Sequence, residues 1–340
     1  MKRRIFGLVI LFILSIFIPA FAYDIEVQPT MISKSNEQDR VWVGTFQIVW
    51  NEFIDKYVHT PVRLKDGTPT YVYELNLKTF DASNLSDKCY YKYSGNITKN
   101  TVKNIKKAIK KKFDETSDIL DVLNPIPGPD NFIIYAMLKK DFEFIKEFDK
   151  LGEFSFGKNM TAEYFGVDNN TQNDIKTGVK VLYYNNPKDF AVMLLTKDNE
   201  EVYLYKNAAN KNFMALYGDM KGKASGYKGS KKFEKDDKLR VPNIKLDLTK
   251  TFEELTERRV IGTNIIISKA METVIFNMDN KGVQLKSEAA MTFVESIGPN
   301  AKKPAPRNFY FDDTFVIFLK EHNARTPYFA LRVSDITKFR

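Results

Sequence analysis

The chain has 340 residues, of which 43% are hydrophobic and 28% are charged, so it can bury a core and does not have the composition of a disordered polymer. Its 52 Lys and Arg residues outnumber its 43 Asp and Glu residues, which gives a formal net charge of +9. A single cysteine, Cys89, excludes an intrachain disulfide. With two histidines and no HExxH, CxxC or Walker pattern, the sequence supports no catalytic residue, metal or cofactor.

The first 22 residues have the pattern of a secretory signal peptide. A basic start, Met1-Lys2-Arg3-Arg4, is followed by an apolar run from Ile5 to Ile18 and a small-residue site, Ala20-Phe21-Ala22. We therefore predict cleavage after Ala22 and a secreted or periplasmic protein. The alternative is a retained membrane anchor, which the short apolar run disfavours. Residues 23–340 are expected to form one domain.

The first part of that domain gives mixed signals. Residues 42–58 are predicted to form a helix or a long strand, and residues 70–80 alternate like a strand. Cys89 is either a free reactive thiol or, as is more common, a buried small hydrophobic residue.

Residues 100–112 are predicted to form an amphipathic helix with a cationic outer face, because Val102, Ile105 and Ile109 recur at helical spacing. The lysines of this face are Lys103, Lys106, Lys107, Lys110 and Lys111. Such a face could hold a polyanion or a membrane surface; the alternative is a solvated face without a ligand. Nucleic acid is not an expected partner, since no aromatic residues for base stacking accompany the lysines.

Three prolines in residues 124–129 predict a break in regular structure. Strand patterns dominate beyond it, and a glycine-containing surface loop is expected at residues 221–230. The predicted strands are residues 132–138, a hairpin of 179–184 with 190–196, and residues 239–246, 271–278, 309–319 and 328–333. Helices first and sheets later indicate an α+β protein.

Residues 309–319, Phe-Tyr-Phe-Asp-Asp-Thr-Phe-Val-Ile-Phe-Leu, resemble the serpin signature, an aromatic and aliphatic strand interrupted by a polar pair, a small residue and a Phe. Further segments that resemble serpins occur in the family's order, at residues 132–148, 241–246, 252–255, 267–282 and 328–333. The chain departs from the family at Asp313, at Ala330 and in residues 135–142, where Phe142 is the best stand-in for a tryptophan. Residues 23–131 are shorter than the helical half of a serpin.

This resemblance implies a divergent serpin-like fold: large mixed and antiparallel sheets, N-terminal helices and an exposed reactive-type loop at residues 282–308. Serpins hold one strand of the main sheet outside as this loop. When a target protease cleaves the loop, the strand inserts into the sheet and drags the acylated protease with it. The implied partner is a serine or cysteine protease, and the protein itself is not an enzyme.

The loop sequence has the alternation that an inserting strand requires. The side chains expected to face the core are Val283, Leu285, Ser287, Ala289, Met291 and Phe293. The residues assigned to the hinge are Gly282, Val283, Gln284 and Leu285, which are bulkier than the small residues of inhibitory serpins. Family spacing gives Ser296-Ile297 as the candidate scissile bond.

Two alternatives stay open. Residues 282–293 could be an ordinary strand with one wet face. The protein could also be a non-inhibitory serpin-like protein that binds a partner through the loop or through the basic helix.

Overall fold

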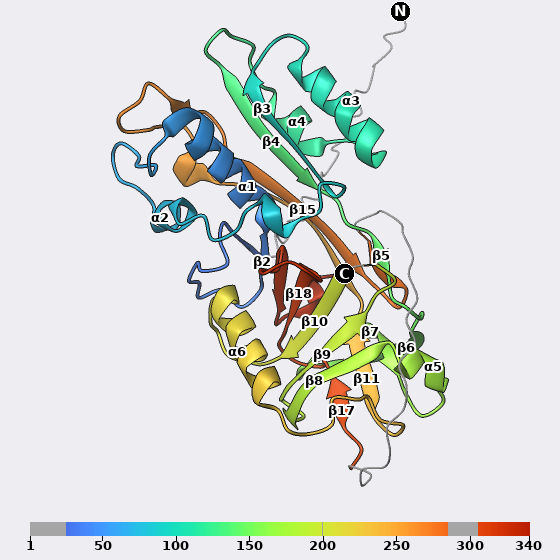
Figure 1. Cartoon of the computed structure of the whole chain (residues 1–340). Coiled ribbons are helices and arrows are strands. Elements are labelled where there is room, and N and C mark those ends of the chain that lie inside the picture. Colours follow the sequence, from blue (N-terminus) through green and yellow to red (C-terminus); the bar gives the residue numbers. More distant parts are fainter. Residues whose placement is uncertain (1–24, 199, 285–304) are drawn as a thin grey trace, which may run out of the picture.

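The computed structural model describes residues 25–198, 200–284 and 305–340. Within these ranges the protein is α+β, with several multi-stranded sheets and few helices, as the sequence predicts (Figure 1). Figure 1 shows a two-stranded ribbon with two helices at the upper end of the molecule and strands of two different sheets at the lower end.

The largest sheet has seven strands in the order β1-β2-β19-β18-β10-β9-β8. Their bounds are β1 Glu26–Gln28, β2 Arg40–Val43, β19 Phe329–Val333, β18 Phe315–Glu321, β10 Glu200–Lys206, β9 Asp189–Leu195 and β8 Val179–Asn186. Residues Phe315 to Lys320 are all buried, because β18 lies in the middle of this sheet and both of its faces are covered.

Two four-stranded sheets complete the main body. One has the order β17-β11-β7-β6, with β17 Asn308–Tyr310, β11 Lys238–Pro242, β7 Met160–Val167 and β6 Asp149–Phe156. The other has the order β12-β15-β16-β5, with β12 Ile244–Thr251, β15 Met271–Met278, β16 Gly282–Gln284 and β5 Phe142–Glu143. Two ribbons are formed by β3 Tyr90–Asn96 with β4 Phe132–Leu138, and by β13 Arg258–Arg259 with β14 Ile266–Ile267.

Most helices lie in the first part of the chain. They are α1 Gly44–Phe53 with a π turn at Ile54–Val58, α2 Thr70–Asn76, α3 Thr101–Phe113, α4 Asp118–Leu123, α5 Asn173–Lys176 and α6 Phe213–Gly226, with 3-10 turns at Ala82–Asn84, Glu253–Leu255 and Ile336–Lys338. None of the helices in the described ranges is long and apolar enough to cross a bilayer.

The buried hydrophobic residues form two clusters. The larger one joins all three main sheets with α1, α2 and α6. A smaller cluster lies between α3, α4 and one face of the β3–β4 ribbon, around Ile105, Ile109 and Tyr135. The two faces of β4 therefore pack on different cores, since Phe132, Ile134, Ala136 and Leu138 contact the larger cluster.

Several predicted elements are confirmed. These are the helix at 100–112, the break at 124–129, the strands at 132–138, 271–278 and 328–333, and the hairpin from 179 to 196. Residues 42–58, predicted as a helix or a long strand, divide into the end of β2, α1 and the π turn.

Other predictions are wrong in instructive ways. Residues 70–80 form α2 and a turn instead of a strand, because Val72 and Leu75, one helical turn apart, are the buried positions. Residues 221–226 belong to α6, whose buried positions Phe213, Leu216 and Met220 keep helical spacing while its glycines are exposed. The predicted strands 239–246 and 309–319 each divide into two strands that belong to different sheets.

Candidate functional site

The candidate site is a strand position between β4 and β15. Within the described residues, β4 pairs only with β3, and the part of β15 from Met271 to Phe276 pairs only with β12. Each strand therefore has one edge without a backbone partner among those residues. Such edges are templates for a further strand.

The short strand β16 lies between the same two parts of the chain. It pairs with β15 on one side, Val283 opposite Met278, and with β5 on the other, Val283 opposite Phe142. Neighbouring strands are about 4.8 Å apart, so β5 and the end of β15 are separated by the width of one strand. Only three residues separate β5 from β4, so β5 continues the line of β4. The strand β16 therefore fills one end of the strand position that lies between the unpaired edges of β4 and β15.

Gly282 is required where β16 begins. A Cβ atom added to this residue would lie 2.2 Å from the backbone oxygen of Phe142, a distance that no real contact has. Val283 is buried, and its neighbours Met278 and Phe142 are buried as well. Of the predicted hinge residues, Gly282, Val283 and Gln284 thus lie in β16. Leu285, Ser287, Ala289, Met291, Phe293, Ser296 and Ile297 lie outside the described residues.

Both borders of the position present apolar side chains to the larger core. On β15 these are Val274, Phe276 and Met278, which are buried. On β4 they are the four residues from Phe132 to Leu138 that contact the same cluster. A strand added here would find an apolar surface on one of its faces.

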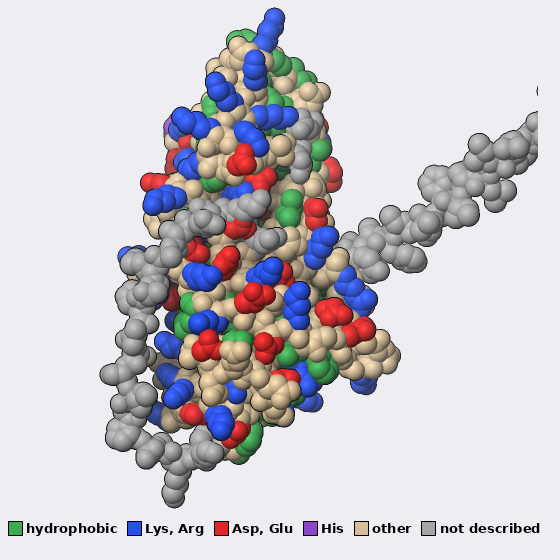
Figure 2. All heavy atoms as spheres, turned by 90° about the vertical axis from the view of Figure 1, so that its right-hand side faces the viewer, with side chains coloured by type: hydrophobic (Ala, Val, Ile, Leu, Met, Phe, Trp, Pro, Cys, Tyr) green, Lys and Arg blue, Asp and Glu red, His purple; other side chains and the backbone are tan. Residues whose placement is uncertain are grey.

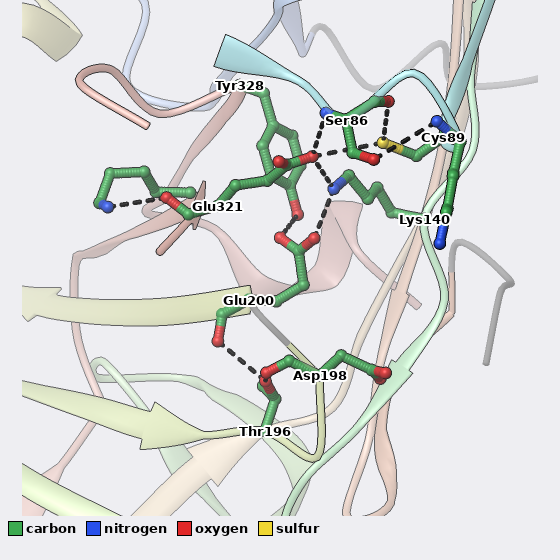
Figure 3. A network of polar contacts seen from close by, with 10 residues as sticks. Ser86, Cys89, Lys140, Thr196, Asp198, Glu200, Glu321 and Tyr328 are labelled. Carbon is green, nitrogen blue, oxygen red and sulfur yellow. Dashed lines mark hydrogen bonds and ion pairs between the residues drawn. The ribbon is translucent and has the colours of Figure 1, made fainter. Parts of the chain in front are cut away.

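A buried ionic cluster holds the junction of β4 and β5 to the seven-stranded sheet (Figure 3). The ammonium group of Lys140, a residue only 5% exposed, pairs with Glu200 of β10 and Glu321 of β18. It also lies 4.9 Å from the ring centre of Tyr328, whose hydroxyl donates to Glu200 at 2.9 Å. Burial is the largest influence and lowers the pKa of Lys140, but the charge of Glu200, the nearby Cys89 and the hydrogen bonds to Glu200 and Glu321 together outweigh it. The pKa is therefore raised and the group is an ammonium ion. Burial raises the pKa of Glu200.

Cys89 lies at the edge of this cluster and is buried (Figure 3). Its thiol donates to the backbone oxygen of Ser86 at 2.9 Å, and burial raises its pKa to about 11. A thiol with a raised pKa is a poor nucleophile at neutral pH, so the buried alternative fits this cysteine and the reactive alternative does not.

A second buried charge lies on the β15 border. Glu272 is 4% exposed, and its Oε1 accepts hydrogen bonds from the hydroxyl of Thr45 at 2.6 Å and the amide of Phe46 at 3.3 Å. No side chain of α1 caps its own N-terminus, so Glu272 supplies this cap from β15. Its Oε2 is buried and has no hydrogen-bond partner among the residues that the structure describes. Burial raises the pKa of Glu272 to about 7.

The predicted cationic helix is α3, and Lys103, Lys107, Lys110 and Lys111 are exposed on it, while Lys106 is half-buried. Figure 2 shows acidic and basic side chains interspersed over the middle of one face, with basic side chains toward the end where Figure 1 places α3. This surface stays a predicted polyanion or membrane site, since it has no feature that selects a ligand.

Sequence reasoning missed the two buried charges. Lys139-Lys140 stands directly after the apolar run of β4, within the residues 135–142 where the chain departs from the family, and this was a usable signal. Glu272 interrupts an otherwise apolar buried face on β15. The sequence does not give the partners of either residue, because Glu200 and Glu321 lie 60 and 181 residues from Lys140.

The chain is similar to the crystal structure of Serpin48, described as a highly specific serpin in the insect Tenebrio molitor, with 13% identity over 81% of this chain and 72% of that chain and a TM-score of 0.43. It is also similar to a serpin from the trematode Schistosoma haematobium, with 11% identity over 68% and 62% and a TM-score of 0.43. No protein-family model matches the chain, and no curated protein matches it. The neighbours are members of the family that residues 309–319 resemble.

Proposed function

We propose that this protein inhibits a serine or cysteine protease by inserting a cleaved loop strand between β4 and β15. The observation that carries the proposal is β16, which pairs with strands on both sides at one end of that position. The chain leaves β16 toward residues whose alternation suits a buried strand. The proposal depends on the sequence of residues 285–293 and on the two strands that would flank the inserted strand, β4 and β15, which the structure describes.

The register of β16 fixes which residues the inserted strand would meet. Along β5 and β4 the pairing is antiparallel, so each step forward in the inserted strand is one step back in these strands. Ser287 would then lie opposite Leu138 and Phe293 opposite Phe132. With β15, Leu285 would lie opposite Phe276 and Ala289 opposite Glu272. An inserted strand from 285 to 293 would therefore satisfy the whole open edge of β4.

The side chains agree with this register. Val283 faces the larger core, so Leu285, Ser287, Ala289, Met291 and Phe293 would face it too. Lys286 would lie beside Ile275, whose side chain is 49% exposed, so its charge would stay near water. Burial of the apolar face supplies the driving force, at about 25 cal/mol per Å².

The bulk of Leu285 argues for the second function that the sequence left open, whereas Val283 already lies within β16. Overpacking at an insertion site costs about 1–3 kcal/mol, and about 1.4 kcal/mol slows insertion tenfold. Slow insertion would let the protease finish its reaction and leave. The chain would then be a substrate, or a non-inhibitory protein that binds a partner through the loop or α3.

Two measurements test the proposal. Proteases of both classes are incubated with the protein and analysed on SDS gels, where an inhibitor gives a complex that survives denaturation. The protein is also nicked in residues 285–304 and its melting temperature is compared with that of the intact chain. A large rise without a stable complex supports insertion but not inhibition. No rise and no complex with any protease contradicts the proposal.

We further propose that the protein is exported, because residues 1–22 have the pattern of a signal peptide. N-terminal sequencing of the protein from the culture medium or periplasm should begin at Tyr23. Retention of Met1 in a membrane fraction would favour the anchor instead.

A further inference from the structure

Two buried arginines face each other across the edge of the seven-stranded sheet. Arg40 of β2 and Arg332 of β19 are direct partners in the antiparallel register, so their side chains lie on the same face. Each is only 1% exposed. Like charges directly opposite each other destabilise a strand pair, and burial makes the repulsion stronger.

The contacts of both guanidinium groups are to neutral oxygens. Nη1 of Arg40 donates to the backbone oxygen of Glu37 at 2.7 Å and to Oδ1 of Asn210 at 2.5 Å, and its Nη2 donates to the backbone oxygen of Lys211. Arg332 spans the same two segments. Its Nη1 donates to the backbone oxygen of Gln38 at 2.6 Å, and its Nη2 donates to that of Ala208 at 3.0 Å. Within the described ranges, neither arginine forms an ion pair with a carboxylate.

The charges of two acids, Glu26 and Asp39, act on these arginines, but both acids are engaged elsewhere. Glu26 accepts a hydrogen bond from the hydroxyl of Ser35. Asp39 accepts hydrogen bonds from the amides of Ser334 and Asp335 and pairs with Lys338 at 3.1 Å. Burial lowers the pKa of Arg40. Burial and the charge of Arg40 lower the pKa of Arg332 to about 10. Two positive charges are therefore buried together with little compensation.

Each arginine also keeps one donor unused. The Nε atoms of Arg40 and Arg332 are both buried and have no hydrogen-bond partner in the part of the chain that the structure describes. Nε and one Nη form the edge of a guanidinium group that binds oxyanions with two parallel hydrogen bonds. Two such edges on opposed strands could share one anion. Water could satisfy the donors but would leave both charges uncompensated.

We propose that Arg40 and Arg332 bind a small oxyanion of the size of phosphate or sulfate. The anion lies beside the segments that contact both guanidinium groups, residues 36–38 and 208–211, which are exposed apart from the half-buried Ala209. Its charge offsets the repulsion between the two arginines and fixes the connection from β10 to α6, against whose Phe213 the Arg40 guanidinium lies at 5.4 Å. The site is independent of the proposed strand insertion.

Thermal unfolding with inorganic phosphate tests the site. The protein is refolded from guanidinium chloride into chloride buffer, so that no anion is carried over, and phosphate is added at constant ionic strength. Saturation should raise the melting temperature by about 3 °C. Arg332→Met should abolish the rise, whereas Arg325→Met, which removes an exposed arginine, should keep it. No rise in the wild type, or an equal rise in Arg332→Met, overturns the proposal.

If Arg332→Met does not fold, a crystal structure of the unmodified protein tests the anion site directly. Crystals of the unmodified protein are grown with selenate, whose selenium gives an anomalous signal. The expected peak lies within hydrogen-bond distance of both Nε atoms. Water or no density at this place contradicts the site, whatever the variants do.

Discussion

Glu272 is the buried acid whose ionisation should control stability. Its pKa is about 7 in the folded protein and near 4.5 in the unfolded chain. The unfolded chain therefore loses its proton first, and stability should fall as pH rises from about 4.5 to about 7 and stay constant above that range. At 1.36 kcal/mol for each unit of pKa, the loss is about 3 kcal/mol.

The change Glu272→Gln removes this titration and keeps an oxygen that can accept from Thr45. Urea unfolding at pH 5 and pH 8 should show that the stability of the variant relative to the wild type is clearly higher at pH 8 than at pH 5. Glu253→Gln, at an exposed glutamate, serves as control and should leave the pH dependence of the wild type unchanged. A variant with the same pH dependence as the wild type would show that Glu272 does not titrate in this range.

Lys140→Met should destabilise the protein by about 3 kcal/mol, because it leaves the carboxylates of Glu200 and Glu321, whose side chains are only 9% and 15% exposed, without their cation. The matched control is Lys197→Met, since Lys197 pairs with Glu143 at the surface, where both side chains are about half exposed or more. The control should change stability by less than about 0.5 kcal/mol. Equal losses of unfolding free energy in the two variants would contradict the role of the buried cluster.

For single residues, the sequence predicts features that depend on neighbours in the chain but not those that depend on distant strands. The hinge stays a prediction, which rests on a pattern formed by neighbouring residues of the chain. The environments of Glu272, Lys140 and Arg332 depend on strands that are distant in sequence, so burial and charge compensation could not be predicted.

At the scale of elements, the local pattern of apolar and polar residues predicted a helix or strand correctly where one face of that element is buried. It predicted α3 and β15 closely, because their buried residues repeat at one period. It was wrong for α6, where glycine suggested a loop. Asn212 caps this helix by accepting from the amide of Ala215 at 2.8 Å, and Phe213, Leu216 and Met220 anchor it. Packing thus overrides the low helix propensity of glycine.

The same helix offers a stabilising change. Gly222 is exposed within α6, and a Cβ atom added there meets nothing within 4 Å. Gly222→Ala should therefore stabilise the protein by about 0.5–1 kcal/mol, measured by urea unfolding. Gly166→Ala is the contrasting change, because its Cβ would lie 2.1 Å from the backbone oxygen of Leu239 and its φ is +151°. It should cost about 1–3 kcal/mol, and a loss of stability in Gly222→Ala would contradict the account of α6.

At the scale of the whole molecule, the α+β class could be predicted, but the partners of the strands could not. The strands β9, β10 and β18 are similar apolar runs, so pattern alone does not say that β10 lies between the other two. The predicted strands at 239–246 and 309–319 crossed from one sheet to another at Asn243 and at residues 311–314. A change of sheet leaves no clear mark in hydrophobic periodicity.

A pair of substitutions in the loop tests whether the whole molecule works as a sheet with room for one more strand. In the register that continues from β16, Ser287 would face the core between Leu138 and Val274, whereas Glu288 would lie on the other face. Ser287→Arg would bury an unpaired charge and should abolish the rise in melting temperature after the loop is nicked. Glu288→Arg should keep most of that rise, because its charge stays at the outer face. Equal effects of the two substitutions would contradict this register, since only a strand with the predicted face distinguishes neighbouring residues.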